Sequence, residues 1–416
     1  MTIRLIFYNI LLHLFSPLII LGFLINALFN PRVRRGHAYR LGLTLPPKPR
    51  REAVWIHAVS VGEVNAVKGF IERIRAAGKY EVYLSMSTMT GYDAAVKGYK
   101  DTVTLFYFPF DWPLVIHRFF DSIKPAVMMI AEIEIWPNFI AIAKRRNIPL
   151  YLINARMSEP IAKKYRPYTW FFSSFYAAYD GMFAQSDTDR AFMESIGMQG
   201  ENIAVPGNLK YDVRYTLDAA KSAAVRQRLP NGKIILVAGS THEPEESYLI
   251  TALAKCGRKN DVFPVIVPRD IKRGEELKKL AADHGYTARC VTDGEGSTDM
   301  LIVNVIGELL YYYAHADIVL MGGSFSPSVG GHNILEPLFF KKPVIVGPNM
   351  HNFFEMDEYF AKNGGTMKVS SFEAIGDALA VLINDEQKRI AVGARGESLL
   401  ASNGGAAERT YKAIFG

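Results

Sequence analysis

Gly322-Gly323-Ser324-Phe325, followed by Gly330-Gly331-His332-Asn333-Ile334-Leu335-Glu336-Pro337, decides the fold of the C-terminal half of this chain. An apolar strand ends in the first glycine pair, a glycine-rich loop follows, and a helix is expected to begin near Asn333. Glycines let the backbone approach a phosphate, and a helix N-terminus attracts its negative charge. Glu336, in the first helical turn, can accept hydrogen bonds from ribose hydroxyls. A purely structural loop does not need all these features, so the stretch predicts a nucleotide site.

The segments around this loop alternate between short apolar runs and helical patterns. Such alternation predicts parallel sheets covered by helices on both faces. A polar break near residues 214–232 separates two series of this kind, so we expect two doubly wound α/β domains with ligands in the cleft at the carboxyl ends of both sheets. The expected strands are residues 54–58, 81–85, 103–108, 126–130, 150–153 and 181–184, and then 233–238, 262–267, 300–303, 317–321 and 343–346.

The composition is that of a folded chain with an anionic partner. The 416 residues exceed one ordinary core, which favours two domains. Cys256 and Cys290 stand alone, without the spacing of a disulfide framework or a zinc site. A net charge of +7 indicates a nucleotide, a phospholipid surface, a phosphorylated substrate or a nucleic acid as partner, and charge alone does not choose among them.

Residues 5–31 contain no Lys, Arg, Asp or Glu. Because roughly twenty apolar residues cross a bilayer core, we expect a membrane anchor helix over residues 4–30. A tilted or interfacial helix and a cleaved signal peptide are the alternatives. Basic residues follow this run, so the positive-inside rule places the rest of the chain in the cytoplasm. The basic, proline-containing residues 36–51 predict a linker.

A strand, a turn and a helix start are expected in Val54-Trp55-Ile56-His57-Ala58-Val59-Ser60-Val61-Gly62-Glu63. Ser60 and Glu63 have the spacing of a capping box, in which each side chain satisfies a backbone N–H of the other. The functional alternative makes Glu63 a general base that accepts a proton from a sugar hydroxyl as it attacks an anomeric carbon. His57 is a competing base.

Charged residues also follow later strands of the N-terminal half. Glu132 and Glu134 come directly after a buried strand, and in extended chain both would point to one face, either lining the cleft or returning to solvent. Lys210, in a Gly/Asn turn, either neutralises an anion or is a solvated lysine. Asp187-Thr188-Asp189 matches a motif that holds a metal-bound diphosphate, but helix capping explains it better.

Two turns of the C-terminal half are candidates for anion binding. Ala238-Gly239-Ser240-Thr241-His242-Glu243 ends a strand before a helix, and such a turn presents backbone N–H groups to an anion. The turn is not GxGxxG, which counts against a dinucleotide dehydrogenase. Pro268 and Arg269 end the next strand and offer a guanidinium to a phosphate or a base.

In content and order these motifs resemble those of the 3-deoxy-D-manno-octulosonic acid (Kdo) transferases of lipopolysaccharide synthesis. The resemblance runs from the N-terminal anchor to about residue 355. So many matches in the same order make a chance resemblance improbable. The matching segments are residues 57–63, 132–138, 154–158, 207–212, 238–243, 307–309 and 330–336.

The resemblance implies a GT-B fold, with a Rossmann-like acceptor domain over residues 36–214 and a Rossmann-like donor domain over residues 233–416. It implies CMP-Kdo as donor, a lipid A precursor (lipid IVA) as acceptor, and a place on the cytoplasmic face of the inner membrane, against its anionic surface. It also implies inversion at the anomeric carbon without a metal or a cofactor, and we expect no nucleic-acid partner.

For the site, the resemblance implies that Glu63 is the catalytic base and that Glu132 or Glu134, together with Lys210, assists the transition state. The expected substrate-binding residues are Ser60, Gly62, Ser240, Thr241, Pro268, Arg269, Ile306, Gly307, Glu308, Gly323, Ser324, Gly331, Asn333, Ile334, Leu335 and Glu336.

The sequence departs from the family pattern at two places. Asp270 stands where His is common after Pro-Arg, and Asn304-Val305 where Asp-Thr is common before Gly-Glu-Leu. These departures leave the detail of donor contact open. Two other functions remain as alternatives: a glycosyltransferase or epimerase that uses a UDP-sugar, and a membrane-tethered nucleotide-binding protein without catalysis. The presence of Glu63 in its motif argues against the latter.

Overall fold

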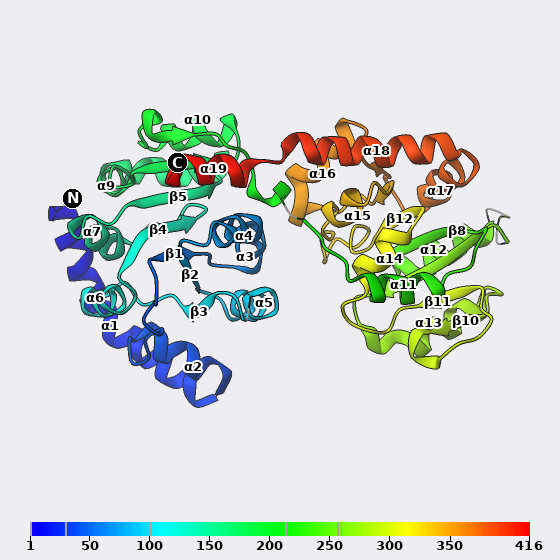
Figure 1. Ribbon diagram of the computed structural model, residues 1–416, viewed down its shortest axis with the longest axis horizontal. Coiled ribbons are helices and arrows are strands. Elements are labelled where there is room, and N and C mark those ends of the chain that lie inside the picture. The colour runs from blue at the N-terminus through cyan, green and yellow to red at the C-terminus, as the bar shows by residue number, and fades with distance from the viewer. Residues whose placement is uncertain (1, 30, 100, 213, 256–257, 259) are drawn as a thin grey trace. The chain divides into compact units, whose positions relative to one another are not determined.

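The computed structural model describes residues 2–29, 31–99, 101–212, 214–255, 258 and 260–416, so Cys256 lies outside the described residues. The chain divides into two compact units. Unit 1 comprises Met1–Val213 and Asn403–Gly416, and unit 2 comprises Arg214–Ser402. Each unit contains one seven-stranded parallel sheet with helices packed around it (Figure 1).

Unit 1 has the strand order β3-β2-β1-β4-β5-β6-β7. The chain first builds the sheet outward from β1 and then returns to the other side of β1, which makes the β1/β4 edge the switch point where such sheets bind ligands. The strands are β1 (Ala53–His57), β2 (Glu81–Met86), β3 (Thr104–Tyr107), β4 (Pro125–Ala131), β5 (Leu150–Ala155), β6 (Gly181–Ala184) and β7 (Ile203–Ala204). The helices are α3 (Val61–Ala66), α4 (Lys68–Ala76), α5 (Met89–Tyr99), α6 (Pro113–Ile123), α7 (Pro137–Arg145), α8 (Glu159–Tyr165), α9 (Thr169–Tyr176) and α10 (Asp187–Ser195), with 3-10 turns η1 (Arg166–Tyr168), η2 (Gly200–Asn202) and η3 (Leu209–Asp212).

Unit 2 repeats this arrangement with the order β10-β11-β9-β8-β12-β13-β14, so its switch point lies between β8 and β12. The strands are β8 (Ile234–Thr241), β9 (Val262–Pro268), β10 (Ala288–Cys290), β11 (Met300–Ile302), β12 (Ile318–Met321), β13 (Val344–Val346) and β14 (Met367–Lys368). The helices are α11 (Ala219–Gln227), α12 (Glu245–Lys255), α13 (Gly274–Asp283), α14 (Leu309–His315), α15 (Leu335–Phe339), α16 (Phe354–Lys362), α17 (Ala374–Asn384) and α18 (Glu386–Asn403), with 3-10 turns η4 (Ile271–Arg273), η5 (Val291–Asp293) and η6 (His351–Phe353).

The two expected series of parallel strands are confirmed. All five residues of β1 are buried, because helices cover both faces of the sheet and a strand between them reads as a continuous apolar run. Trp55 packs edge-on against Phe139 at 5.2 Å and donates its indole N–H to the Ser85 hydroxyl at 2.8 Å. The strands β7, β10 and β14 were not predicted, since two or three residues carry no recognisable period.

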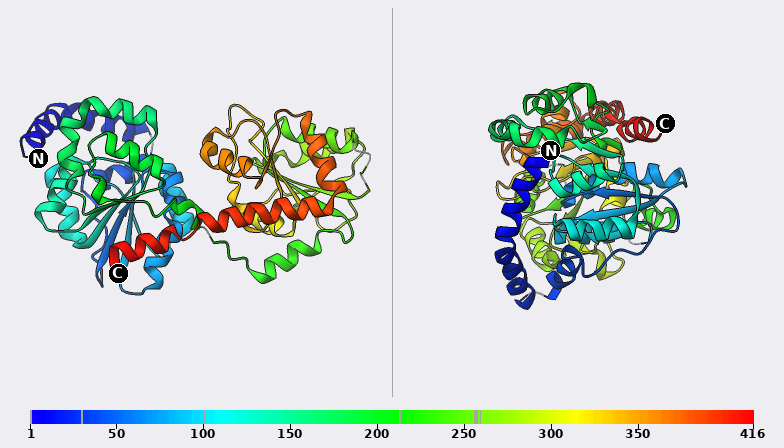
Figure 2. Two further views of the ribbon diagram at one scale, coloured as in Figure 1. Left: turned by 90° about the horizontal axis from the view of Figure 1, so that it is seen from above. Right: turned by 90° about the vertical axis from the view of Figure 1, so that its left-hand side faces the viewer.

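At the N-terminus, α1 (Thr2–Phe29) leads into α2 (Pro31–Arg40). Ile3–Gly22 is long and apolar enough to cross a membrane, with a mean hydropathy of 2.0. Both views in Figure 2 show α1 on the outside of unit 1. The predicted linker at residues 36–51 is wrong at its start, because α2 continues to Arg40 before the prolines interrupt regular structure.

The predicted donor domain of residues 233–416 also has different bounds in the structure. Unit 2 already includes α11, and the last helix, α19 (Ala406–Phe415), belongs to unit 1. Ala406 and Ala407 join the buried cluster that contains Leu209 and the apolar face of α4. Sequence spacing does not reveal that the chain returns to its first unit, because the amphipathic pattern of α19 fits either core.

Candidate active site and nucleotide site

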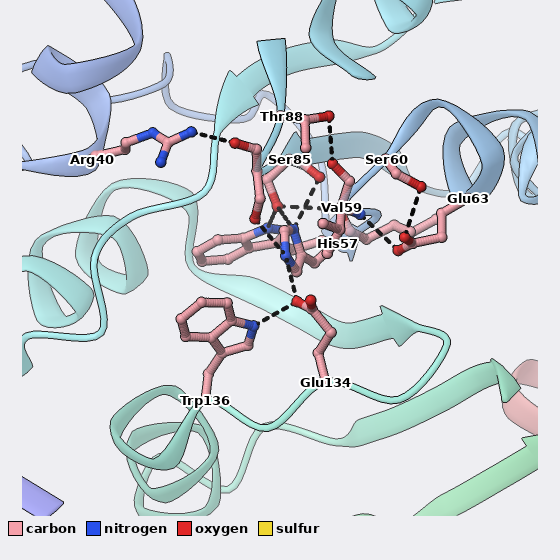
Figure 3. Close-up of polar contacts among 12 residues, drawn as sticks. Arg40, His57, Val59, Ser60, Glu63, Ser85, Thr88, Glu134 and Trp136 are labelled. Carbon is pink, nitrogen blue, oxygen red and sulfur yellow. Dashed lines mark hydrogen bonds and ion pairs between the residues drawn. The ribbon is translucent and has the colours of Figure 1, made fainter. Parts of the chain in front are cut away.

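Glu63 lies in the first turn of α3, just after the switch-point strand β1. Its Oε2 accepts the Val59 backbone N–H at 2.7 Å, and its Oε1 accepts the Ser60 hydroxyl at 2.9 Å (Figure 3). Ser60 is the N-cap of α3, but its side chain accepts no hydrogen bond from the helix. The predicted capping box is therefore absent, because Glu63 accepts the backbone N–H of Val59 and not that of Ser60. The two bonds that do form fix the Glu63 carboxylate at the carboxyl end of the sheet.

The Glu63 side chain is poorly solvated, with 8% of the residue exposed. Burial, together with the negative charges of Glu132 and Glu134, raises its pKa to about 7 against the opposing effect of the bonds from Val59 and Ser60. A carboxyl with a pKa near neutrality exchanges a proton readily at physiological pH. This is the property required of a general base.

Glu132 follows β4 in a left-handed backbone conformation, with φ of 57°. Such a conformation is uncommon for a residue with a side chain and often marks a functional site. The chain is therefore not extended at Glu132, so the extended backbone on which the prediction for Glu132 and Glu134 depended is absent. Burial raises the pKa of Glu132, whereas the positive charges of Lys210 and Arg156 lower it.

Glu134 has other partners. Its Oε2 lies 3.4 Å from Nε2 of His57 and accepts the Trp136 indole N–H at 2.9 Å (Figure 3). His57 is fully buried and stacks on Phe108 at 3.9 Å, while its Nδ1 lies 3.0 Å from the Ser85 hydroxyl. A proton on Nε2 is donated to Glu134, while Nδ1 lies 3.0 Å from both the hydroxyl and the carbonyl oxygen of Ser85. His57 thus holds Glu134 rather than competing with Glu63 as a base. The hydrogen bond from Trp136 to Glu134 was not predicted from the sequence.

Lys210 belongs to η3, and hydrogen bonds attach η3 to the end of β5. Asn154, at the end of β5, has a left-handed backbone with φ of 51°. Its side chain accepts the Leu209 N–H at 2.9 Å. The Asn208 side chain accepts the Lys210 N–H at 2.9 Å. Two segments that are far apart in sequence are joined in this way, and they bring the charge of Lys210 close enough to Glu132 to lower its pKa.

The capping role predicted for residues 187–189 falls on Ser186 instead, because α10 already begins at Asp187. The Ser186 hydroxyl accepts the Asp189 N–H at 3.1 Å, and the Asp189 carboxylate accepts the Met157 N–H at 2.8 Å. Within the described ranges, one group of three side chains has metal-ligand spacing, and it lies elsewhere, at Glu275, Cys290 and Asp293. The Lys278 ammonium already pairs with both carboxylates of that group, at 2.6 Å and 3.2 Å.

In unit 2, a carboxylate that the sequence analysis missed organises the glycine-rich loop. Glu245, fully buried at the start of α12, accepts the backbone N–H groups of His242 at 2.9 Å, Gly323 at 2.7 Å and Phe325 at 3.0 Å. These bonds join the turn after β8 to the loop after β12, across the switch point of the sheet. Burial raises the pKa of Glu245, and the three bonds oppose this shift.

The loop itself has the backbone conformation that glycine allows. Gly323 and Gly331 have φ of 69° and 79°, and the Gly331 N–H donates to the Gly323 carbonyl at 2.9 Å. The following helix, α15, begins at Leu335, two residues later than expected, and is short. Asn333 precedes it and accepts the Leu335 N–H at 3.1 Å. Its amide nitrogen lies 3.3 Å from Glu336.

Glu336 is half-buried, and burial raises its pKa to about 7.

Three of the side chains expected to bind a ligand are used by the fold itself. Ile334 and Leu335 lie in the core, so only their backbone atoms are available to a ligand. The buried Ser324 hydroxyl donates to the Met321 carbonyl at 2.5 Å and accepts the Gly347 N–H at 2.8 Å, so it is also committed.

The remaining expected contacts differ in exposure. Arg269 is exposed, and its backbone N–H donates to the Thr241 carbonyl at 2.9 Å. The predicted turn at residues 238–243 is partly wrong, because β8 continues to Thr241 with an irregularity at Ser240, whose φ is 56°.

Beyond β11, residues 306–308 lie on the surface or near it. Ile306 is 85% exposed, and Gly307 has φ of 90°. Glu308 pairs with Arg228 at 2.5 Å. The other prominent contact at the β8/β12 edge is between two histidines, His242 and His332, whose Nε2 atoms lie 3.0 Å apart.

Residues 35–213 match the family model described as 3-Deoxy-D-manno-octulosonic-acid transferase (kdotransferase). The chain is also 29% identical to a 3-deoxy-D-manno-octulosonic acid transferase of Haemophilus influenzae, over 97% of this chain and 96% of that one. Its similarity to Kdo transferases extends along nearly the whole chain. A Kdo transferase from Bordetella pertussis is 28% identical over 88% of each chain.

A solved structure with the same fold confirms the expected GT-B architecture. A UDP-GlcNAc 2-epimerase from Neisseria meningitidis aligns with a TM-score of 0.58 over 87% of this chain and 99% of its own. Since the identity is 12%, the match concerns the fold alone.

Proposed function

We propose that this protein transfers Kdo from CMP-Kdo to a lipid A precursor, lipid IVA, in lipopolysaccharide biosynthesis, with Glu63 as general base. The observation that carries the proposal is the buried Glu63 carboxylate at the switch point of unit 1, whose pKa lies near 7. Relatives that align over nearly the whole chain are named Kdo transferases, which supports the donor sugar.

The reaction is an inverting displacement at the anomeric carbon. Glu63 accepts the proton of the acceptor hydroxyl while the hydroxyl oxygen forms the new glycosidic bond. The bond between the anomeric carbon and the phosphate oxygen of CMP-Kdo breaks on the opposite side, and CMP leaves with the electron pair. The proton on Glu63 then passes to solvent, which restores the carboxylate.

The contacts favour different roles for the two other glutamates. His57 and Trp136 already engage Glu134, so we assign it an electrostatic role that keeps the pKa of Glu63 high. Glu132 instead interacts with the charges of Lys210 and Arg156. We therefore propose Glu132 and Lys210 as the pair that assists the transition state, since preorganised charges are the strongest means of stabilising it.

For the donor, we propose a site at the β8/β12 edge of unit 2. The exposed Arg269 supplies a positive charge for a phosphate at this edge of the sheet. Glu336, next to Asn333, is placed to bind ribose hydroxyls. Asp270, which departs from the family pattern, accepts the Lys272 N–H at 3.0 Å, so its carboxylate is used in the turn η4.

We propose that the leaving phosphate needs no metal ion, because Arg269 and backbone N–H groups can meet its charge. Transfer should then continue in the presence of EDTA. We further propose that α1 holds the enzyme at the cytoplasmic face of the inner membrane, where its phosphorylated acceptor resides.

The experiment that tests the proposed reaction combines purified protein, CMP-Kdo and lipid IVA, with mass spectrometry of the products. A mass increase of the acceptor by one or more Kdo residues is expected. The alternative is a UDP-sugar enzyme, which the epimerase fold makes worth testing. Titration calorimetry with CMP and with UDP separates the two, and a clear preference for UDP would contradict the Kdo assignment.

A further inference from the structure

The helix α1 carries polar side chains that contact unit 1 rather than facing an apolar phase. The amide groups of Asn9 and Asn138 exchange two hydrogen bonds, at 2.9 Å and 2.8 Å. The Tyr8 hydroxyl bonds to the buried Asp111 carboxylate, and the Arg4 guanidinium lies 3.5 Å from the Ser173 hydroxyl. These contacts bind the first turns of α1 to the globular unit.

The docking site is itself well ordered by hydrogen bonds. The Asp111 carboxylate accepts the backbone N–H groups of Asn138 and Phe139, at 2.9 Å and 2.8 Å, and so caps the N-terminus of α7. Asn138 is almost fully buried, and α1 packs along α7. An asparagine pair with both amides satisfied is costly to break, because each buried polar group would lose its partner.

The other end of α1 returns to the same unit. It leads directly into α2, which packs on β3. The Arg40 carbonyl accepts the Phe110 N–H at 2.8 Å, and the Arg40 guanidinium bonds to the Ser87 carbonyl. Figures 1 and 2 show α1 running along the outside of unit 1 between these two attachments. Because the first turns of α1 and the helix that follows it are both attached to one globular unit, we expect both ends of α1 to stay on one side of a bilayer.

The face of α1 that points away from unit 1 is broadly apolar. Within the described side chains, the half-buried positions recur with helical spacing, at Leu5, Asn9, Leu12, Ser16 and Ile19. The large apolar side chains between them are exposed: Ile3, Ile6, Phe7, Ile10, Leu11, Leu14, Phe15, Leu18, Ile20, Leu21 and Ile25.

Exposed aromatic and basic residues lie on or near α8 and α9, and α9 contacts α1 through Ser173. Tyr168 and Trp170 are 55% and 61% exposed near the start of α9, the helix that carries Ser173. Tyr and Trp favour the headgroup region of a membrane. Lys163 and Lys164, in the last turn of α8, carry charges that anionic lipids attract.

We infer that α1 lies flat on an anionic lipid surface as a docked, non-spanning helix, with its exposed apolar face in the bilayer and its half-buried stripe on unit 1. This inference deepens the proposed membrane role and rests on it. Of the alternatives left open by the sequence, the structure supports the interfacial helix. A surface helix of this kind holds unit 1, and with it Glu63, against the membrane that contains the acceptor.

Topology is tested by thiol labelling in spheroplasts of a bacterial host that expresses the full chain. Cys256 and Cys290 are replaced by Ser, and one cysteine is introduced either in a short hydrophilic N-terminal tag or as Lys79→Cys, at an exposed site of unit 1. A membrane-impermeant maleimide should label neither position before lysis and both after it. Labelling of the tag but not of Lys79→Cys in intact spheroplasts would show a spanning helix and overturn the inference.

Contact with lipid is tested on the purified chain with an environment-sensitive fluorophore at Leu14→Cys. Vesicles that contain phosphatidylglycerol should shift its emission to the blue, and nitroxide lipids should quench it, whereas the same fluorophore at Lys79→Cys should not respond. An unchanged signal at Leu14→Cys would overturn the lipid contact. Neither experiment uses CMP-Kdo, so an absence of Kdo transfer would contradict the proposed function and leave these results unaffected.

Discussion

The Nε2 atom of His57 lies 3.4 Å from Oε2 of Glu134, the same oxygen that accepts the Trp136 indole N–H. Two N–H groups on different elements therefore fix one carboxylate beside the proposed base. Because the charge of Glu134 is among those that raise the pKa of Glu63, this contact couples a buried histidine to the chemistry without placing it near the substrate.

Trp136→Phe removes the indole N–H and keeps most of the ring. We expect kcat to fall by about tenfold, since a hydrogen bond to a charged group contributes about 1.5–3 kcal/mol. Trp112→Phe is the matched control, because the buried Trp112 N–H has no hydrogen-bond partner in the described part of the chain. Steady-state kinetics on both variants provides the check, and equal kcat values for the two would contradict the role of Glu134.

The activity should depend on pH through Glu63. A base acts in its ionised form, so kcat should rise with pH and level off above about pH 7, the pKa to which burial raises this carboxyl. Glu336 has a pKa of about 7 as well, so Glu336→Gln is the control, measured at saturating CMP-Kdo. If kcat of this variant still falls at low pH, the titrating group is Glu63. If the fall disappears, the titrating group is Glu336.

The same pKa has a consequence for stability. The pKa of Glu63 is about 7 in the folded protein and near 4.5 as an ordinary carboxyl, so its contribution to stability is present below the lower value and lost as pH rises through the higher one. Glu63→Gln should therefore raise the Tm relative to the native chain at about pH 8 and leave little difference at about pH 4. Scanning calorimetry at both pH values tests this prediction, and an opposite trend in Tm would contradict it.

Glu245→Gln should weaken CMP binding. The carboxylate accepts three backbone N–H groups, and an amide nitrogen cannot accept any of them, so part of the glycine-rich loop loses its support. We expect a loss of CMP affinity of about tenfold, equivalent to one broken hydrogen bond of a charged group. Its neighbour Glu246 is buried too, but pairs with Arg273 at 2.8 Å. Glu246→Gln should lower the Tm with little change in calorimetric CMP affinity, and similar affinities for both variants would argue against the role of Glu245.

Asp212→Asn tests whether α19 supports Lys210. The Asp212 carboxylate accepts the Ala407 N–H at 2.6 Å and also that of Gly405, and so joins the N-terminus of α19 to η3. Loss of this cap should lower kcat more than it changes KM, because Lys210 is displaced from Glu132. Glu408→Gln, which removes the exposed contact with Arg73, is the control on the same helix. If both variants lower the Tm but leave kcat unchanged, the position of Lys210 does not depend on the contact between α19 and η3.

Much of the fold was predictable from local pattern. The continuous apolar runs of β1 and β8 and the helices between strands are properties of short segments, and they were enough for two parallel sheets. The return of α19 to unit 1 was not predictable, because it depends on which core accepts Ala406 and Ala407. The bounds of α2 were missed for a different reason, since prolines mark where a helix ends but not how far it extends.

The site was predictable in part. Glu63 and Lys210 could be selected from their motifs, but the left-handed backbone at Glu132 could not be predicted from the local pattern. The Glu245 interactions were also hidden, because they join residues some eighty positions apart. Conversely, Ser324 and Ile334 lie within a binding motif and yet serve the core, which a motif alone does not reveal.

The most direct test of the central claim is kcat of Glu63→Gln with CMP-Kdo and lipid IVA, measured beside its calorimetric affinity for CMP. A general base contributes about 10²–10⁴-fold to the rate, so we expect kcat to fall by that factor while the CMP affinity changes by less than about twofold. A variant that binds CMP normally and transfers Kdo at the native rate would contradict the assignment of Glu63 as the base.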